Sequence, residues 1–159
     1  MDKEPRTGPA LGDGYPLAGL MRSVLGKGKP FRFEARGTSM HPFIRDGDRV
    51  TVAPFAGREP RTGDVVAFAD PGTDGVRVHR VVGAADGRFV LKGDYDLRAD
   101  KVARDAILGL VVRLERGGRD RPLGPAFRAE AAARLSRTFW FTRLARLARR
   151  ARLRWEGRA

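Results

Sequence analysis

The chain has 159 residues, of which 42% are hydrophobic and 32% are charged, with no Cys and two His. Without Cys it can form neither a disulfide nor a thiolate nucleophile, so nothing in the sequence requires an oxidising compartment. Two His residues are too few for a His/Cys zinc site, and we expect no metal or other cofactor. The composition fits one globular domain, and the 20 Gly and 10 Pro favour short strands and turns over a helical bundle.

The net charge of +13 is concentrated near the C-terminus. Residues 128–159 contain ten Arg and two Glu, which gives this segment +8 of the total. Such a segment is attracted to anionic surfaces, whether lipid headgroups, nucleic acid or acidic protein. No apolar run approaches the roughly 18 residues that a spanning helix needs. We therefore expect no transmembrane span, no signal peptide and a cytoplasmic protein, with peripheral attachment to the membrane as an option.

The first 30 residues are expected to form a mobile leader, polar from Met1 to Gly14, with a short helical turn near Gly19 to Gly28. From Phe31 onward apolar and polar residues alternate, and clusters of Gly, Pro and Asp separate the alternating runs. This pattern predicts six strands, at Phe31–Ala35, Arg49–Ala53, Asp64–Ala69, Val76–Val82, Arg88–Leu91 and Ile107–Leu114. The dipeptide Asp86-Gly87 predicts a tight antiparallel hairpin between the fourth and fifth strands.

After the turn-rich segment Gly117 to Pro125 the composition changes to Ala, Leu and Arg with a helical period. Between Trp140 and Trp155 the large apolar residues share one face and the Arg residues cover the rest, which predicts a basic amphipathic helix. Such a helix can lie on an anionic membrane surface, pack on its own domain or bind a partner. The expected organisation is a leader (1–30), a β domain (31–116) and a linker with the basic helix (117–159).

The stretch Gly37-Thr-Ser-Met-His-Pro-Phe-Ile-Arg-Asp-Gly-Asp48 places a small hydroxyl residue, Ser39, in a turn bounded by Gly37 and Pro42. A nucleophilic Ser needs an exposed Oγ and nearby backbone N–H groups that can stabilise an oxyanion, and such a turn can supply both. Taken alone, however, a Ser in a loop is more often a turn or capping residue.

Ser39 belongs to a series of six segments along the chain. They are Gly37-Thr38-Ser39-Met40-x-Pro42, Gly47-Asp48-x-Val50, Gly63-Asp64-Val65-Val66, Val76-Arg-Val-His-Arg-Val-Val-Gly83, Lys92-Gly93-Asp94 and Ile107-Leu108-Gly109-Leu110-Val111. In this order and spacing they resemble the serine peptidase superfamily of signal peptidase I and the self-cleaving repressors. His79 stands where bacterial signal peptidases have Lys, which is similar to the endoplasmic reticulum, archaeal and sporulation-type branch. The resemblance implies a mostly β fold, a coiled sheet or barrel.

The resemblance also implies the catalytic roles. Ser39 would be the nucleophile and His79 its general base. Asp100 would orient the imidazole, with Asp94 as a supporting or alternative partner, and the two are not ranked. Lys92 is a weaker candidate for the base, because Lys is not the base of the Lys-Gly-Asp motif in that family.

Substrate and oxyanion contacts are expected from Gly37, Thr38, Met40 and Pro42, with the backbone N–H of Ser39 as the main oxyanion donor. His41 has no counterpart in the motif and is not counted as a base. The aspartates that follow Gly47 and Gly63 are expected to cap turns.

The resulting expectation is a Ser/His serine endopeptidase that processes a specific protein or peptide precursor, beside small residues such as Ala. A self-cleaving regulator is disfavoured, because those repressors use Lys and carry a helix-turn-helix for which the first 30 residues are unsuited. The alternative from another class is an inactive or regulatory binding module that uses residues 128–159 on membrane or nucleic acid. Nucleic acid is not an expected partner, since the β domain lacks interleaved aromatic and basic residues.

Overall fold

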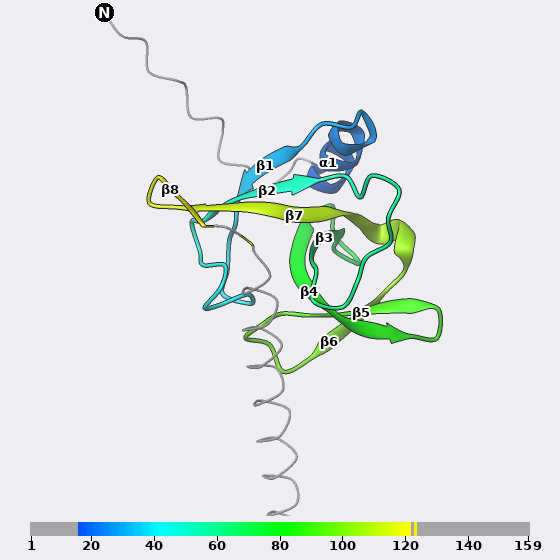
Figure 1. The fold of residues 1–159 in the computed structure, drawn as a ribbon. Coiled ribbons are helices and arrows are strands. Elements are labelled where there is room, and N and C mark those ends of the chain that lie inside the picture. Colours follow the sequence, from blue (N-terminus) through cyan, green and yellow to red (C-terminus); the bar gives the residue numbers. More distant parts are fainter. Residues whose placement is uncertain (1–15, 122, 124–159) are drawn as a thin grey trace, which may run out of the picture. The chain divides into compact units, whose positions relative to one another are not determined.

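The computed structural model describes residues 16–121 and 123 of the chain (Figure 1). The leader Met1 to Gly14 and the basic helix predicted within residues 128–159 lie outside the described residues. The elements are, in chain order, α1 (Leu17–Gly26), β1 (Phe31–Glu34), β2 (Arg49–Ala53), β3 (Val65–Ala69), β4 (Val76–Ala85), β5 (Arg88–Lys92), β6 (Ala99–Val102), the short 3-10 helix η1 (Arg104–Ala106), β7 (Ile107–Arg116) and β8 (Arg119–Arg121).

The strands form one antiparallel sheet in the order β1-β2-β7-β3-β4-β5-β6, and β8 pairs with β7. Strand β7 lies between β2 and β3, so the last long strand of the described chain connects the first strands to the middle ones. The sheet curls on itself, with β5 and β6 turned away from the plane of β1 and β2 (Figure 1). The predicted mostly β, coiled-sheet fold is confirmed.

A core of apolar side chains fills the curled part of the sheet. Its buried members are Phe55, Val66, Phe68, Val81, Leu91, Val102 and Ile107. Strand β3 is buried at four successive positions, because both of its faces are covered. This explains why its sequence, Val-Val-Ala-Phe-Ala, is a continuous apolar run instead of an alternating one.

All six predicted strands are present, and the structure adds β6 and β8. The three residues of β8 are all exposed, and β6 buries only its last residue, Val102. Alternation of apolar and polar residues is the signal of a half-buried strand, so strands at a sheet edge with little burial give no such pattern. Strand β8 extends the sheet into the segment after Gly117 that we expected to be turn and linker.

Two-residue turns join β4 to β5 and β7 to β8. Ala85 pairs with Arg88, and the predicted turn residues Asp86 and Gly87 have φ of 53° and 69°. A two-residue hairpin of this kind needs positive φ at both positions, which Asp tolerates and Gly adopts without strain. The predicted Asp86-Gly87 hairpin is therefore confirmed.

Helix α1 begins two residues before the predicted helical turn and packs on the sheet. Its residues Met21 and Leu25 are buried, and Leu25 reaches the backbone of Gly109 in β7. The short helix expected near Gly19–Gly28 is thus present, and it packs on the sheet. Among the described residues, no helix is long and apolar enough to cross a membrane.

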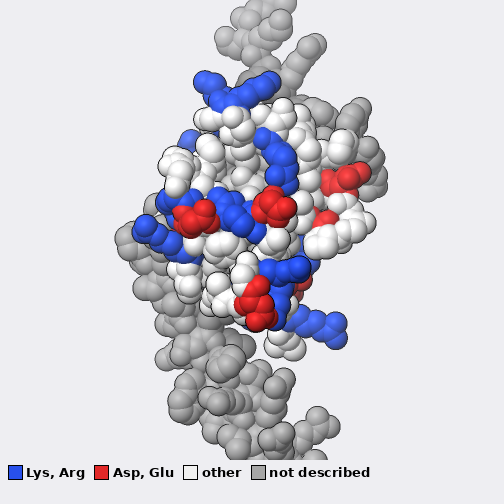
Figure 2. Space-filling view, turned by 90° about the vertical axis from the view of Figure 1, so that its right-hand side faces the viewer, with Lys and Arg blue, Asp and Glu red and all other residues white. Residues whose placement is uncertain are grey.

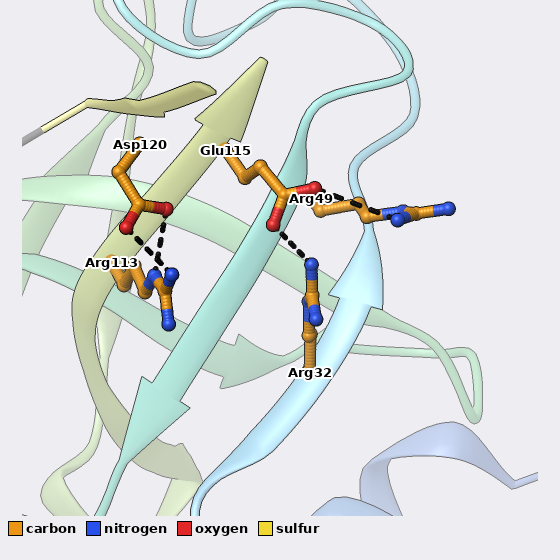
Figure 3. Close-up of polar contacts among 5 residues, drawn as sticks. All are labelled: Arg32, Arg49, Arg113, Glu115 and Asp120. Carbon is orange, nitrogen blue, oxygen red and sulfur yellow. Dashed lines mark hydrogen bonds and ion pairs between the residues drawn. The ribbon is translucent and has the colours of Figure 1, made fainter. Parts of the chain in front are cut away.

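Ion pairs connect the outer strands on the polar side of the sheet (Figure 3). Glu115 of β7 accepts hydrogen bonds from Arg32 of β1 and from Arg49 of β2, while Arg113 donates two bonds, of 2.9 and 2.6 Å, to Asp120 of β8. Because these pairs are largely exposed, each contributes little to stability. On the face seen in Figure 2, Lys and Arg side chains likewise lie beside Asp and Glu and do not form one basic patch.

The packing of β7 against β2 and α1 yields a stability prediction. A Cβ at Gly109 would lie 2.6 Å from Cγ1 of Val52 and 2.7 Å from the carbonyl oxygen of Ala53. We expect Gly109→Ala to lower the free energy of unfolding by about 1–3 kcal/mol, because the strands must separate to admit the methyl group. Urea denaturation measures this. Gly83→Ala is the matched control, since a Cβ there meets nothing within 4 Å; equal effects of the two changes would contradict the packing argument.

Candidate active site

Strand β4 carries two adjacent buried side chains that can be positively charged, His79 and Arg80. Each is only 1% exposed. Successive side chains of a strand point to opposite faces of the sheet, so each of the two must find its own partner. An unpartnered buried charge or polar group is costly, and a carboxylate is the natural partner for each. The site is built on these two pairs.

His79 is paired with Asp100. Its Nδ1 lies 3.1 Å from Oδ2 of Asp100, which comes from β6, two strands away in the sheet. Strand register explains the meeting: Val81 pairs with Leu91 and Leu91 with Asp100, so Asp100 lies on the face that His79 and Val81 share. The ring of Phe68 covers the imidazole, with 5.5 Å between the ring centroids.

Arg77 lies on the same face and modifies this pair. Its Nη1 is 3.3 Å from the same Asp100 oxygen, and its guanidinium stacks over Phe68. Burial lowers the pKa of His79 below its usual value of 6.5, and the charge of Arg77 lowers it further, whereas Asp100 and Asp96 act in the opposite direction. The imidazole is therefore neutral at neutral pH. With Nδ1–H donated to Asp100, the lone pair is on Nε2.

Arg80, on the opposite face, takes the other aspartate that we considered as a partner for His79. Its guanidinium donates two bonds of 2.8 Å to the carboxylate of Asp94, which is buried, and a third of 3.0 Å to the carbonyl oxygen of Gly63. It also stacks over the ring of Phe43. Asp94 is thus placed with Arg80, and Asp100 with His79. Lys92 is in register with Arg80, on the face that His79 does not use.

Ser39 is half-buried in the loop of residues 35–48, called the Ser39 loop below. The loop begins near Gly37, which has a φ of 90° and donates its N–H to Asp46. Met40 and Ile44 are buried and anchor the loop to the domain. Within residues 16–121 the Ser39 amide makes no hydrogen bond. The side chain of Met40 faces the interior, whereas Thr38 is exposed and Pro42 is half-buried.

Asp48 closes the Ser39 loop. It accepts a bond of 2.7 Å from the Arg45 amide and two bonds, of 2.8 and 2.7 Å, from Arg116 at the end of β7. Arg116 also donates to the carbonyl oxygen of Phe43. Burial acts to raise the pKa of Asp48, but the bonds from Arg116 and the Arg45 amide hold it below its usual value. Asp64 caps its turn in the same way through the amide of Arg61. The turn-capping roles expected of both aspartates are confirmed.

A close backbone contact brings the Ser39 loop to the loop that follows β5. The amide of Tyr95 donates a 2.8 Å bond to the carbonyl oxygen of Ser39. Gly93 is buried at the contact, and a Cβ there would lie 2.6 Å from the same oxygen and 2.5 Å from Oδ2 of Asp96. Only Gly allows this approach. His41 meets the Tyr95 ring edge to face, at 6.3 Å between centroids.

Asp96 is a residue of the site that the sequence did not single out. Its Oδ2 lies 3.5 Å from Nε2 of His79, and that nitrogen is buried with no hydrogen-bond partner among the described residues. Asp96 lies between Asp94 and Asp100 in the chain, and no motif marks it. The sequence carries no signal for this role, because the contact above Gly93 that places Asp96 exists only in the folded chain. Within the described part of the chain, no cluster of His, Asp and Glu could hold a metal ion.

The backbone of Ser39 and the buried imidazole of His79 thus both contact residues 93–96, but Oγ of Ser39 makes no hydrogen bond with Nε2 of His79. A family model described as Peptidase S24-like matches residues 13–112. The chain belongs to this Peptidase S24-like family, which points to a serine peptidase or a self-cleaving protease. No curated protein matches the chain.

The buried Arg80–Asp94 pair yields a second stability prediction. Removing one member leaves the other charge buried and uncompensated, so we expect Arg80→Ala to cost about 3–5 kcal/mol of unfolding free energy. Urea or thermal denaturation measures the loss. Lys101→Ala, which removes an ion pair with Asp86 whose side chains are 55% and 79% exposed, is the control and should cost below about 1 kcal/mol. A loss for Arg80→Ala as small as that of the control would contradict a structural role for the pair.

Proposed function

We propose that the protein is a serine endopeptidase of the Ser/His signal peptidase type, with Ser39 as nucleophile and His79 as general base. The observation that carries the proposal is the His79–Asp100 pair, in which the imidazole is buried. Its Nε2, without a hydrogen-bond partner among the described residues, lies 3.5 Å from Asp96, near the contact of Ser39 with Tyr95. A neutral imidazole with its lone pair on Nε2 can accept the Ser hydroxyl proton.

In this mechanism Oγ of Ser39 attacks the carbonyl carbon of the scissile peptide bond while its proton passes to Nε2 of His79. The amide of Ser39, together with the Gly37 turn, stabilises the negative charge on the carbonyl oxygen. The imidazolium then gives its proton to the leaving amine, and the C–N bond breaks. Water hydrolyses the resulting acyl-enzyme by the same steps, with His79 again as base.

Asp100 serves the imidazole in two ways. It holds the ring in the tautomer that leaves Nε2 unprotonated, and it stabilises the imidazolium that forms during attack. Asp94 contributes indirectly, because its bonds with Arg80 hold the chain leading to Tyr95 and Asp96. Asp100 is therefore the better candidate for the orienting carboxylate.

The proposed substrate is a specific protein or peptide precursor, bound in extended form so that its backbone pairs beside the Ser39 loop. Thr38 and Pro42 lie on the accessible part of that loop and are proposed to contact it. Attachment of residues 128–159 to an anionic membrane surface, which would bring the enzyme to membrane-bound precursors, is part of the proposal. A location on the cytoplasmic side of a membrane follows from it.

The nucleophile and the base are tested together. Purified full-length protein is incubated with a library of natural peptides, and new termini are mapped by mass spectrometry. We expect Ser39→Ala and His79→Ala each to lower the rate of cleavage at least about a thousandfold. Ser23→Ala, which removes an exposed hydroxyl in α1, should leave it unchanged. Equal cleavage by all variants would overturn the assignment, and no cleavage by wild type would favour a binding module.

The pH profile tests the base independently. Because the pKa of His79 in the folded protein is below 6.5, activity should persist at pH 6.5 and fall only as the pH drops through that lower pKa. Arg77→Gln removes a charge that opposes protonation, so its acid limb of kcat/KM should move to higher pH. Arg88→Gln, at an exposed position in β5, is the control. An acid limb that stays in place for Arg77→Gln would exclude His79 as the titrating base.

A further inference from the structure

Most carboxylates of the described residues are paired with an Arg or Lys, and Asp96 is an exception beside the candidate site. Asp48, Asp64, Asp94 and Asp100 all have a guanidinium within 3.3 Å. Within residues 16–121, no Lys or Arg lies within 4 Å of Asp96, although the chain has 32 basic residues. The one charge contact of Asp96 among the described residues is with Nε2 of His79, at 3.5 Å.

His79 does not satisfy Asp96. The imidazole is neutral at neutral pH and directs its Nδ1–H to Asp100, so the nitrogen that faces Asp96 carries a lone pair. A lone pair and a carboxylate 3.5 Å apart repel each other and make no hydrogen bond. The free protein therefore presents a negative charge without a basic partner among the described residues. A positively charged hydrogen-bond donor from a substrate would satisfy this carboxylate and leave Nε2 free for the Ser39 proton.

The carboxylate is positioned to meet a substrate. Its side chain is 36% exposed, and it shares the space above Gly93 with the carbonyl oxygen of Ser39. It lies between Tyr95 and Leu97, which are 70% and 80% exposed and are among the most exposed large hydrophobic residues described. A Lys or Arg side chain suits such a surface, since its aliphatic stem packs on apolar groups and its charged end can lie against an aromatic ring.

We infer that Asp96 is a specificity residue, and that it binds a basic side chain of the substrate one or two positions from the scissile bond. The inference rests on the proposed peptidase function and names the class of substrate. This inference is compatible with a small residue at the cleaved bond itself, because the carboxylate binds the side chain of a neighbouring substrate position. The opposing view is that Asp96 only supports the imidazolium, in which case it would serve all substrates equally.

The test uses peptides built around one bond that the wild-type protein cleaves in a Ser39-dependent manner. At each nearby position Arg, Gln or Glu is placed in turn, and kcat/KM is measured at a pH where His79 is neutral. At one position wild type should prefer Arg over Gln by about tenfold. Asp96→Asn should abolish this preference, so that its kcat/KM is the same for the Arg and Gln peptides. Asp96→Lys should instead prefer Glu.

Two further variants serve as controls for the effect of the charge at position 96. Asp96→Glu keeps the charge and should keep part of the preference for Arg. Asp105→Asn removes another exposed carboxylate without an Arg or Lys partner among the described residues, and it should behave as wild type. Ser39-dependent cleavage without a basic preference at any position overturns the inference while the proposed function stands. An equal loss for all peptides in Asp96→Asn also overturns it, in favour of a role through His79. Absence of Ser39-dependent cleavage overturns both.

Discussion

The site depends on the alternation of side chains along one strand. His79 and Arg80 are neighbours in β4, both are buried, and the pleat sends them to opposite faces of the sheet. Each is therefore paired with a different aspartate, Arg80 with Asp94 in the loop after β5 and His79 with Asp100 in β6. One face obtains a neutral, hydrogen-bonded imidazole, and the other obtains a fixed ion pair. His79 of the candidate site and Arg80 of the supporting ion pair are thus adjacent in the sequence.

The buried Arg80 also contacts the loop that carries Ser39. Arg80 contacts Phe43 and the Gly63 turn as well as Asp94, so three loops share one buried guanidinium. Gly93 lets two of these loops approach until their backbones hydrogen-bond. The loops that carry Ser39 and Asp96 are thus tied to buried groups of the sheet, which restricts their geometry.

Much of this arrangement could be predicted from the sequence, and the failures have physical causes. Six strands and the Asp86-Gly87 hairpin follow from alternation and turn chemistry, which are local properties. Strand β8 gives no signal because none of its residues is buried. The choice between Asp94 and Asp100 depends on register across three strands, and the role of Asp96 depends on a contact over Gly93. Neither the partner of His79 nor the role of Asp96 can be predicted from residues that are adjacent in the sequence. The Ser39, His79 and Asp100 roles themselves remain predictions.

The hydrogen bonds from Arg116 to Asp48 also bear on when the Ser39 loop can become ordered. Arg116, which closes the Ser39 loop, comes 68 residues later in the chain, at the end of the strand that joins the two parts of the sheet. A growing chain that already contains Ser39, His79 and Asp100 still lacks the group that holds the Ser39 loop. Contacts this distant in sequence form late, since the intervening chain must first be ordered. The Ser39 loop therefore acquires its bonds to Arg116 only after the last residue of β7 has been made.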